Sequence, residues 1–208
     1  MLNKQKELVT RLSDKELLRQ LYLTQLIMLV IASSLGFFLF PDLHSFLALW
    51  SLSDMRIVTY GAATAVLVIC IDFAAMRIFP EHMLDDGGIN QRVFAKRSVP
   101  HLLLLTLTIS FTEEILFRGI IQTNFGLWAS SILFAILHFR YLEKAVLFIM
   151  VVGVSFLLGL VYQWTDNLFA PVAAHFMIDF VLALYIRFQY VRRDLYDNHV
   201  KSGEKKTE

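Results

Sequence analysis

The sequence predicts an all-α integral membrane protein, a polytopic helical bundle of about six membrane segments. Of its 208 residues, 57% are hydrophobic and only 18% are charged, whereas a soluble domain averages about 45–50% apolar and about 25% charged residues. The apolar residues form long unbroken runs, and the mean hydropathy is +0.59. A transmembrane β-barrel would instead show alternating segments of about 10 residues. This composition also excludes a disordered chain, a collagen repeat and a disulfide scaffold.

The first 20 residues are polar and precede the first apolar run. Leucines recur there at roughly helical spacing, and Ser13-Asp14-Lys15-Glu16 fits a capping box at a helix start. We expect residues 1–20 to contain a cytoplasmic amphipathic helix over 5–20 that leads into the first membrane segment. It carries no residue pattern that points to chemistry.

A helix crosses about 30 Å of hydrocarbon with about 20 residues. Apolar runs of this kind follow one another to residue 190 with no internal repeat or linker, so residues 21–190 form one membrane domain and 191–208 a cytoplasmic polar tail. The third run is interrupted by charged residues, and the fourth is too short to cross alone. The expected membrane segments are 21–40, 57–79, 100–126, 127–139, 145–164 and 168–189.

The lysines and arginines predict the orientation of these segments. If six segments alternate, nearly all basic residues fall on one side: in the N-terminal segment, the loop after the second segment, the 140–144 connection and the tail. Only Arg56 falls on the other side, and Arg118 lies within a segment. Because cytoplasmic loops carry the excess of Lys and Arg, both termini are predicted to be cytoplasmic.

Ionisable side chains at membrane depth cost a few kcal/mol each on insertion scales, so they are functional candidates by default. Three groups occur on three different segments. They are Glu113-Glu114-Ile115-Leu116-Phe117-Arg118, then Phe134 with His138, then His175 with Asp179.

Helical spacing suggests how these residues pair. Residues four apart share a helix face, so Glu114 and Arg118 can form an ion pair while Glu113 points about 100° away. His175 and Asp179 share a face in the same way, and a carboxylate that accepts an imidazole N–H would fix its tautomer. Helix rise places the three groups near the same depth, so we expect a hydrated cavity that opens toward the cytoplasm and has these side chains at its floor.

A carboxylate and two imidazoles in a wet pocket can hydrolyse a bond in two ways. Glu113 could take a proton from water while imidazole N–H groups stabilise the oxyanion at an attacked carbonyl. Alternatively Glu113, His138 and His175 could hold a divalent metal such as zinc, which would acidify the water itself. The residues alone leave both alternatives open, so the cofactor is either none or a divalent metal.

The three motifs, in this order on hydrophobic helices, resemble the signature of the CAAX-protease and bacteriocin-processing (CPBP, or Abi) family of intramembrane proteases. The resemblance covers residues 98–190, which we treat as the catalytic core. It implies that Glu113 activates water with help from His138, and that His175 and Asp179 bind or stabilise the oxyanion. Arg118 and Glu114 resemble the pair that shapes the site. Eukaryotic members usually have Asn where this chain has Asp179.

We therefore predict an intramembrane endopeptidase in a cell membrane, most simply a bacterial plasma membrane. Its partners would be membrane lipids and a membrane-associated peptide or protein substrate. A net charge of +1 gives no footprint for nucleic acid. Gly87-Gly88 lacks the following Lys-Ser/Thr of a phosphate loop, so no nucleotide is expected. The alternatives are a non-catalytic immunity or scaffolding protein of the same fold and a small ion-coupled transporter.

Overall fold

The computed structural model describes residues 11–138 and 141–204, with side chains as far as Tyr196, and the regular structure of these residues is helical. This confirms the all-α prediction. The helices, of which η1 and η2 are π-helical, are α2 (Asp14–Leu39), α3 (Leu43–Leu47), η1 (Ile57–Ala62), α4 (Ala63–Ile78), α5 (Glu81–Leu84), α6 (Ile89–Phe94), α7 (Val99–Glu114), η2 (Ile115–Gln122), α8 (Thr123–Leu137), α9 (Ala145–Thr165) and α10 (Phe169–Glu204).

Five helical stretches of the described chain are long and apolar enough to cross a membrane, which confirms a polytopic membrane bundle. Four of them match predicted segments. The fifth is a single continuous stretch that takes in both the third and the fourth predicted segments. The five are Asp14–Leu39, Ile57–Ile78, Val99–Leu137, Ala145–Thr165 and Phe169–Tyr196.

The Val99–Leu137 stretch reverses direction at Gly126, where the backbone leaves helical geometry with φ 84° and ψ 170°. Glycine tolerates this positive φ because it has no Cβ. Two residues on opposite sides of the turn, Phe117 and Phe134, have ring centroids only 4.8 Å apart, whereas a straight helix would separate them by about 25 Å. The stretch is therefore a helical hairpin, and its turn coincides with the predicted boundary between 126 and 127.

The first arm of this hairpin changes from α-helix to π-helix directly after Glu114. A π-helix leaves some carbonyls without the usual partner, and side chains from the next turn compensate here. Thr123 Oγ1 donates to the Arg118 carbonyl at 3.0 Å, and Asn124 Nδ2 donates to the Ile120 carbonyl at 2.8 Å. Every residue of η2 is buried, so this wider turn lies inside the bundle. Short π-helical turns within α-helices often occur at functional sites.

Two boundaries predicted near the ends of the chain, at residues 20 and 190, lie inside continuous helices. Ser13 and Glu16 form the expected capping box, but α2 then continues through residue 21 without a break, because nothing there ends the helix. Leu17 packs against Leu105 and Ile109 of α7, so this turn belongs to the bundle. Residues 5–10 of the predicted amphipathic helix lie outside the described residues. α10 likewise passes residue 190 and continues to Glu204.

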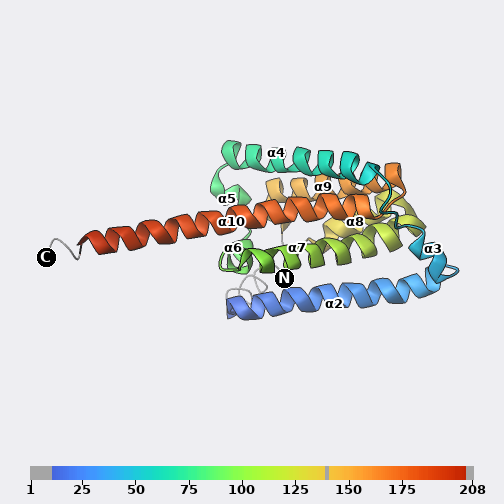
Figure 1. Ribbon diagram of the computed structural model, residues 1–208, viewed down its shortest axis with the longest axis horizontal. Coiled ribbons are helices and arrows are strands. Elements are labelled where there is room, and N and C mark those ends of the chain that lie inside the picture. The colour runs from blue at the N-terminus through green and yellow to red at the C-terminus, as the bar shows by residue number, and fades with distance from the viewer. Residues whose placement is uncertain (1–10, 139–140, 205–208) are drawn as a thin grey trace.

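In Figure 1 the start of α2 and the far part of α10 lie at the same end of the bundle, together with α5 and α6. We call this the terminal end. The opposite end, with α3 and the chain that follows it, is the loop end. Both described ends of the chain thus share one side, and the assignment of that side to the cytoplasm stays a prediction.

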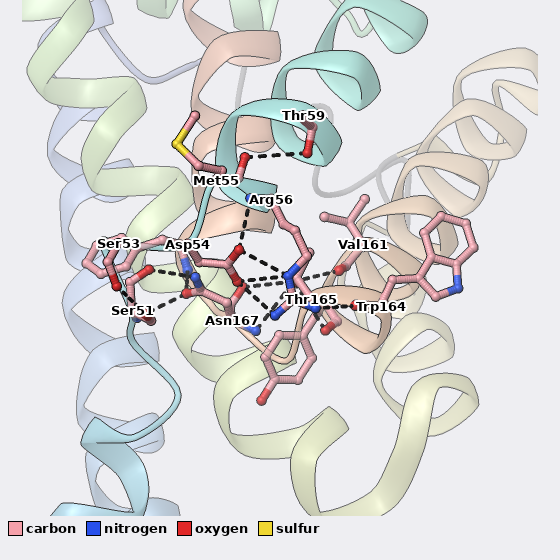
Figure 2. Close-up of polar contacts among 12 residues, drawn as sticks. Ser51, Ser53, Asp54, Met55, Arg56, Thr59, Val161, Trp164, Thr165 and Asn167 are labelled. Atoms are coloured by element: carbon pink, nitrogen blue, oxygen red, sulfur yellow. Dashed lines mark hydrogen bonds and ion pairs between the residues drawn. The ribbon is translucent and has the colours of Figure 1, made fainter.

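The loop end is held by a network of polar contacts (Figure 2). Asn167 follows α9 and is 2% exposed. Its Nδ2 donates to the Ser51 carbonyl at 2.7 Å, and its Oδ1 accepts from the Ser51 N–H at 3.3 Å and the Phe169 N–H at 3.1 Å. One amide therefore joins the segment before η1 to the turn between α9 and α10.

The largest group of buried apolar side chains packs around η2, with members from α2, α8, α9 and the start of α10. A cavity of about 540 Å³ lies beside it, between α2, α3 and η2. Its lining is mainly apolar and includes Ala32, Phe46 and Ile120. No predicted site residue lines this cavity, so it is not the hydrated pocket expected from the sequence, which stays a prediction.

Candidate active site

Glu114, at the last position of α7, is completely buried and lies between two cationic or potentially cationic groups. Its Oε2 is 3.1 Å from Arg118 Nε, and both side chains are 0% exposed. Its Oε1 is 2.8 Å from His175 Nδ1 on α10. The predicted pairing of Glu114 with Arg118 is confirmed. The contact with His175, 61 positions along the chain, was not predicted.

His175 has a carboxyl group near each ring nitrogen. A carboxylate only accepts hydrogen bonds, so His175 Nδ1 carries a proton and donates it to Glu114 Oε1 at 2.8 Å. Asp179 Oδ2 is 3.6 Å from Nε2, longer than a hydrogen bond. The predicted proximity of His175 and Asp179 is confirmed, but the prediction that Asp179 fixes the tautomer is wrong, because Glu114 is the closer partner.

Glu113 lies one residue before Glu114 and faces a different part of the bundle, as the helical angle predicts. It is 9% exposed and lies within electrostatic range of His175, Asp179 and Glu114. Gln25 of α2, itself 3% exposed, is close enough to interact with its carboxyl group. Glu113 therefore borders the same group of side chains as His175 without sharing the ion pair of Glu114.

His138 is joined to this group through an aromatic ring. Phe134 stacks on His138 with ring centroids 4.5 Å apart and meets His175 edge-on at 6.4 Å. The Arg118 guanidinium carbon lies 5.3 Å from the centre of the same ring. Phe134 thus packs against the side chains of His138, His175 and Arg118. His138 Nδ1 lies 2.9 Å from the Phe134 carbonyl, to which an Nδ1–H donates, so the neutral ring keeps its lone pair on Nε2.

Three other polar residues at the site were not predicted from the sequence. Ser130 on α8 and Ser155 on α9 are fully buried and bind the Arg118 guanidinium. Gln25 also accepts a short hydrogen bond from Thr112. A buried amide in the middle of an apolar run is a signal that could have identified Gln25, because such groups need a partner inside a membrane protein. Single serines in membrane helices are too common to give such a signal.

The residues that the sequence suggests for a metal, Glu113, His138 and His175, do not fit one in this arrangement. Within residues 11–138 and 141–196, no group of three or more His, Cys, Asp or Glu side chains is arranged to hold a metal ion. Of the three suggested ligands, His175 directs Nδ1 at Glu114 and Nε2 toward Asp179. We therefore derive no step through a metal.

Comparison with known proteins places this site in a family. A family model described as type II CAAX prenyl endopeptidase Rce1-like matches residues 95–181, a range that contains every site residue from Glu113 to Asp179. The uncharacterized protein YpbD of Bacillus subtilis (strain 168) is 56% identical over 185 residues, which are 89% of this chain and 98% of that protein. No solved structure matches the chain. The chain therefore belongs to the Rce1-like family of type II CAAX endopeptidases.

Proposed function

We propose that the protein is an intramembrane endopeptidase that hydrolyses peptide bonds of membrane-associated peptides or proteins. The observation that carries the proposal is the buried group of Glu113, Glu114 and His175, in which one glutamate is occupied by ion pairs and the other is not. Glu114 interacts with Arg118 and His175. Glu113 makes neither of these contacts, so its carboxyl group is the one suited to act as a base.

In the proposed mechanism Glu113 removes a proton from a water molecule as the water oxygen bonds to the scissile carbonyl carbon. The carbonyl electrons move to its oxygen, which becomes an oxyanion. When the tetrahedral intermediate collapses, the C–N bond breaks and Glu113 returns the proton to the leaving amine. His138, whose neutral ring has its lone pair on Nε2, assists in orienting the water.

His175 and Asp179 support the oxyanion in this mechanism. With Nδ1–H held by Glu114 at 2.8 Å, a protonated His175 presents Nε2–H as a donor for the oxyanion, and such preorganised donors are worth about 10²–10³ in rate. Asp179, 3.6 Å from Nε2, favours the protonated ring. Glu114 and Arg118 keep the ring in place.

The proposed location is a bacterial plasma membrane. The five long apolar stretches support a multi-pass membrane protein, and the relative YpbD is from a bacterium. Lipids would surround the bundle, and the substrate would reach the site from within or beside the membrane. The family's name includes a prenyl group, but our proposal does not require the substrate of this chain to carry one.

The test uses the purified protein in detergent micelles with a mixture of membrane-spanning and membrane-proximal peptides in H₂¹⁸O. Mass spectrometry would detect new carboxyl termini that carry ¹⁸O, which shows hydrolysis. We expect Glu113→Gln to lower the cleavage rate by at least about 10²-fold, because the amide cannot accept the proton. The matched control is Glu81→Gln, which changes an exposed glutamate on α5 and is expected to cleave at the wild-type rate.

Cleavage by Glu113→Gln at the wild-type rate would exclude Glu113 as the base. No cleavage by the wild type would favour a non-catalytic protein of this fold. Elemental analysis of the same active preparation bears on the cofactor. Activity that copurifies with one equivalent of metal and is lost on chelation would contradict the metal-independent mechanism.

A further inference from the structure

We propose that Ser130 and Ser155 are positioning residues of this site, acting on His175 through Arg118 and Glu114. The inference rests on the proposed function. Arg118 Nη1 donates to Ser130 Oγ at 3.1 Å. Nη2 donates to the Ser155 carbonyl at 3.1 Å and to its Oγ at 3.3 Å. The guanidinium on η2 is thus bound by α8 and α9.

These hydrogen bonds, rather than the ion pair with Glu114, determine the direction of the guanidinium. Arg118 Nε and Glu114 Oε2 are 3.1 Å apart, yet within the described residues neither atom has a partner with the angles of a hydrogen bond. Coulomb attraction at this distance holds the charges together but depends little on angle. Hydrogen bonds weaken steeply when misaligned, so the serines supply the directional restraint.

The Ser130 hydroxyl is itself fixed. It has a single proton, which it donates to the Phe117 carbonyl at 2.7 Å, and this leaves its lone pairs to accept from Arg118. Both serines and Arg118 are 0% exposed. Because no bulk water reaches them, a lost hydroxyl would leave a buried N–H of the guanidinium without a partner, and Arg118 would shift or tilt to find another.

Such a shift passes directly to His175. Glu114 uses one carboxylate oxygen for Arg118 and the other for His175 Nδ1. The carboxylate is planar and rigid, so movement at one oxygen moves the other. A misplacement of about 1 Å at a catalytic group can cost about 10²-fold in rate, even though neither serine touches the substrate.

Ser131 provides a matched control. It follows Ser130 on the same helix and is equally buried at 0% exposure, but its hydroxyl donates to the Ser155 carbonyl at 3.4 Å instead of binding Arg118. Ser130→Ala and Ser131→Ala therefore remove the same atom from the same depth of the bundle. Only the first removes a partner of the guanidinium.

The experiment measures kcat and KM of Ser130→Ala, Ser155→Ala and Ser131→Ala on a peptide that the wild type cleaves. It also records the imidazole ¹⁵N chemical shifts of His175 in ¹⁵N-histidine protein, assigned by the missing signals of His175→Gln. We expect kcat to fall about 10- to 100-fold for Ser130→Ala, with KM within about twofold. Ser155→Ala should fall less, because its backbone carbonyl still accepts from Nη2. Ser131→Ala should match the wild type, and the His175 shifts should follow the same order.

Equal kinetics and equal His175 shifts in Ser130→Ala and Ser131→Ala would overturn the inference and leave the proposed function intact. If Ser130→Ala does not fold, the comparison of Ser155→Ala with Ser131→Ala decides in the same way. If instead the wild type cleaves no peptide, the proposed function fails, and the His175 shifts still show whether the serines position the ring.

Discussion

Two of the arginine–carboxylate pairs in the described residues have similar distances and opposite surroundings. Arg118 and Glu114 are 3.1 Å apart in the middle of the bundle, with both side chains 0% exposed. Arg56 and Asp54 are 2.9 Å apart at the loop end, where the arginine side chain is 50% exposed and the aspartate 15%. Figure 2 shows the second pair among the polar residues before η1 and after α9.

The surroundings of an ion pair, more than the distance between its atoms, therefore decide its role. Water around Arg56 screens its charge and can replace Asp54 as a partner, so such a pair contributes little. Around Arg118 water is excluded, and each charge depends on the groups the protein provides. Removing one member there leaves the other uncompensated. The buried pair therefore keeps its helices in a fixed arrangement, whereas the exposed pair lies on a loop that other contacts stabilise.

The largest loss of stability is expected for Arg118→Leu. Glu114 would keep its negative charge at 0% exposure with only His175 as a partner, and breaking a buried pair by removing one member costs about 3–5 kcal/mol. We expect the free energy of unfolding to fall by that amount, measured by SDS titration in mixed micelles and followed by circular dichroism.

The double variant Glu114→Gln/Arg118→Leu separates charge from packing. It removes both charges, so we expect it to be more stable than Arg118→Leu alone. If the double variant is no more stable than the single one, the loss comes from the volume of the arginine, which is among the largest fully buried side chains, and the electrostatic account is wrong.

The sequence was sufficient for the features that depend on composition and on spacing within one helix. Long apolar runs predict the membrane helices because a bilayer requires that length and hydrophobicity. The i, i+4 spacing predicted that Glu114 pairs with Arg118, and it did so across the change from α- to π-helix. The predicted boundary at Gly126 is the turn of the hairpin.

Features that depend on contacts between helices were not predictable in the same way. Whether Asp179 or Glu114 lies nearer to His175 depends on how α7 and α10 pack, and no periodicity within either helix contains that information. The π-helix of η2 also has no clear pattern in the sequence. Ser130 and Ser155 have meaning only through Arg118, which they meet from two other helices.

At the loop end the comparison predicts that an uncharged residue matters more than the ion pair. Asn167 makes three hydrogen bonds to backbone groups of Ser51 and Phe169, and Asn167→Ala would leave those partly buried groups unpaired. We expect a loss of about 1–3 kcal/mol in the free energy of unfolding, measured by the same SDS titration. Ser53→Ala is the control, because it removes an exposed hydroxyl whose partner among the described residues is Ser51 Oγ at 3.3 Å, and it should leave the stability unchanged. Equal losses in both variants would show that Asn167 is not the residue that joins the two segments.

The smallest effect on stability is expected for Arg56→Met, and this effect should depend on pH. Hydrogen bonds from the side chain and backbone of Arg56 hold the pKa of Asp54 below its ordinary value. A carboxyl group with a lowered pKa in the folded state stabilises that state above its unfolded pKa, and the contribution disappears as the pH falls through the folded value. Any difference in unfolding midpoint between wild type and Arg56→Met should therefore be present and small at pH 7, and vanish in acid. It should also shrink in 1 M salt, because salt screens exposed charges.

A loss as large as that of Asn167→Ala, unchanged by acid and salt, would contradict this prediction. It would mean that the hydrogen bond from Arg56 Nη1 to the Trp164 carbonyl at 3.1 Å holds the loop. The contrast between exposed and buried arginines would then not apply at this end of the bundle.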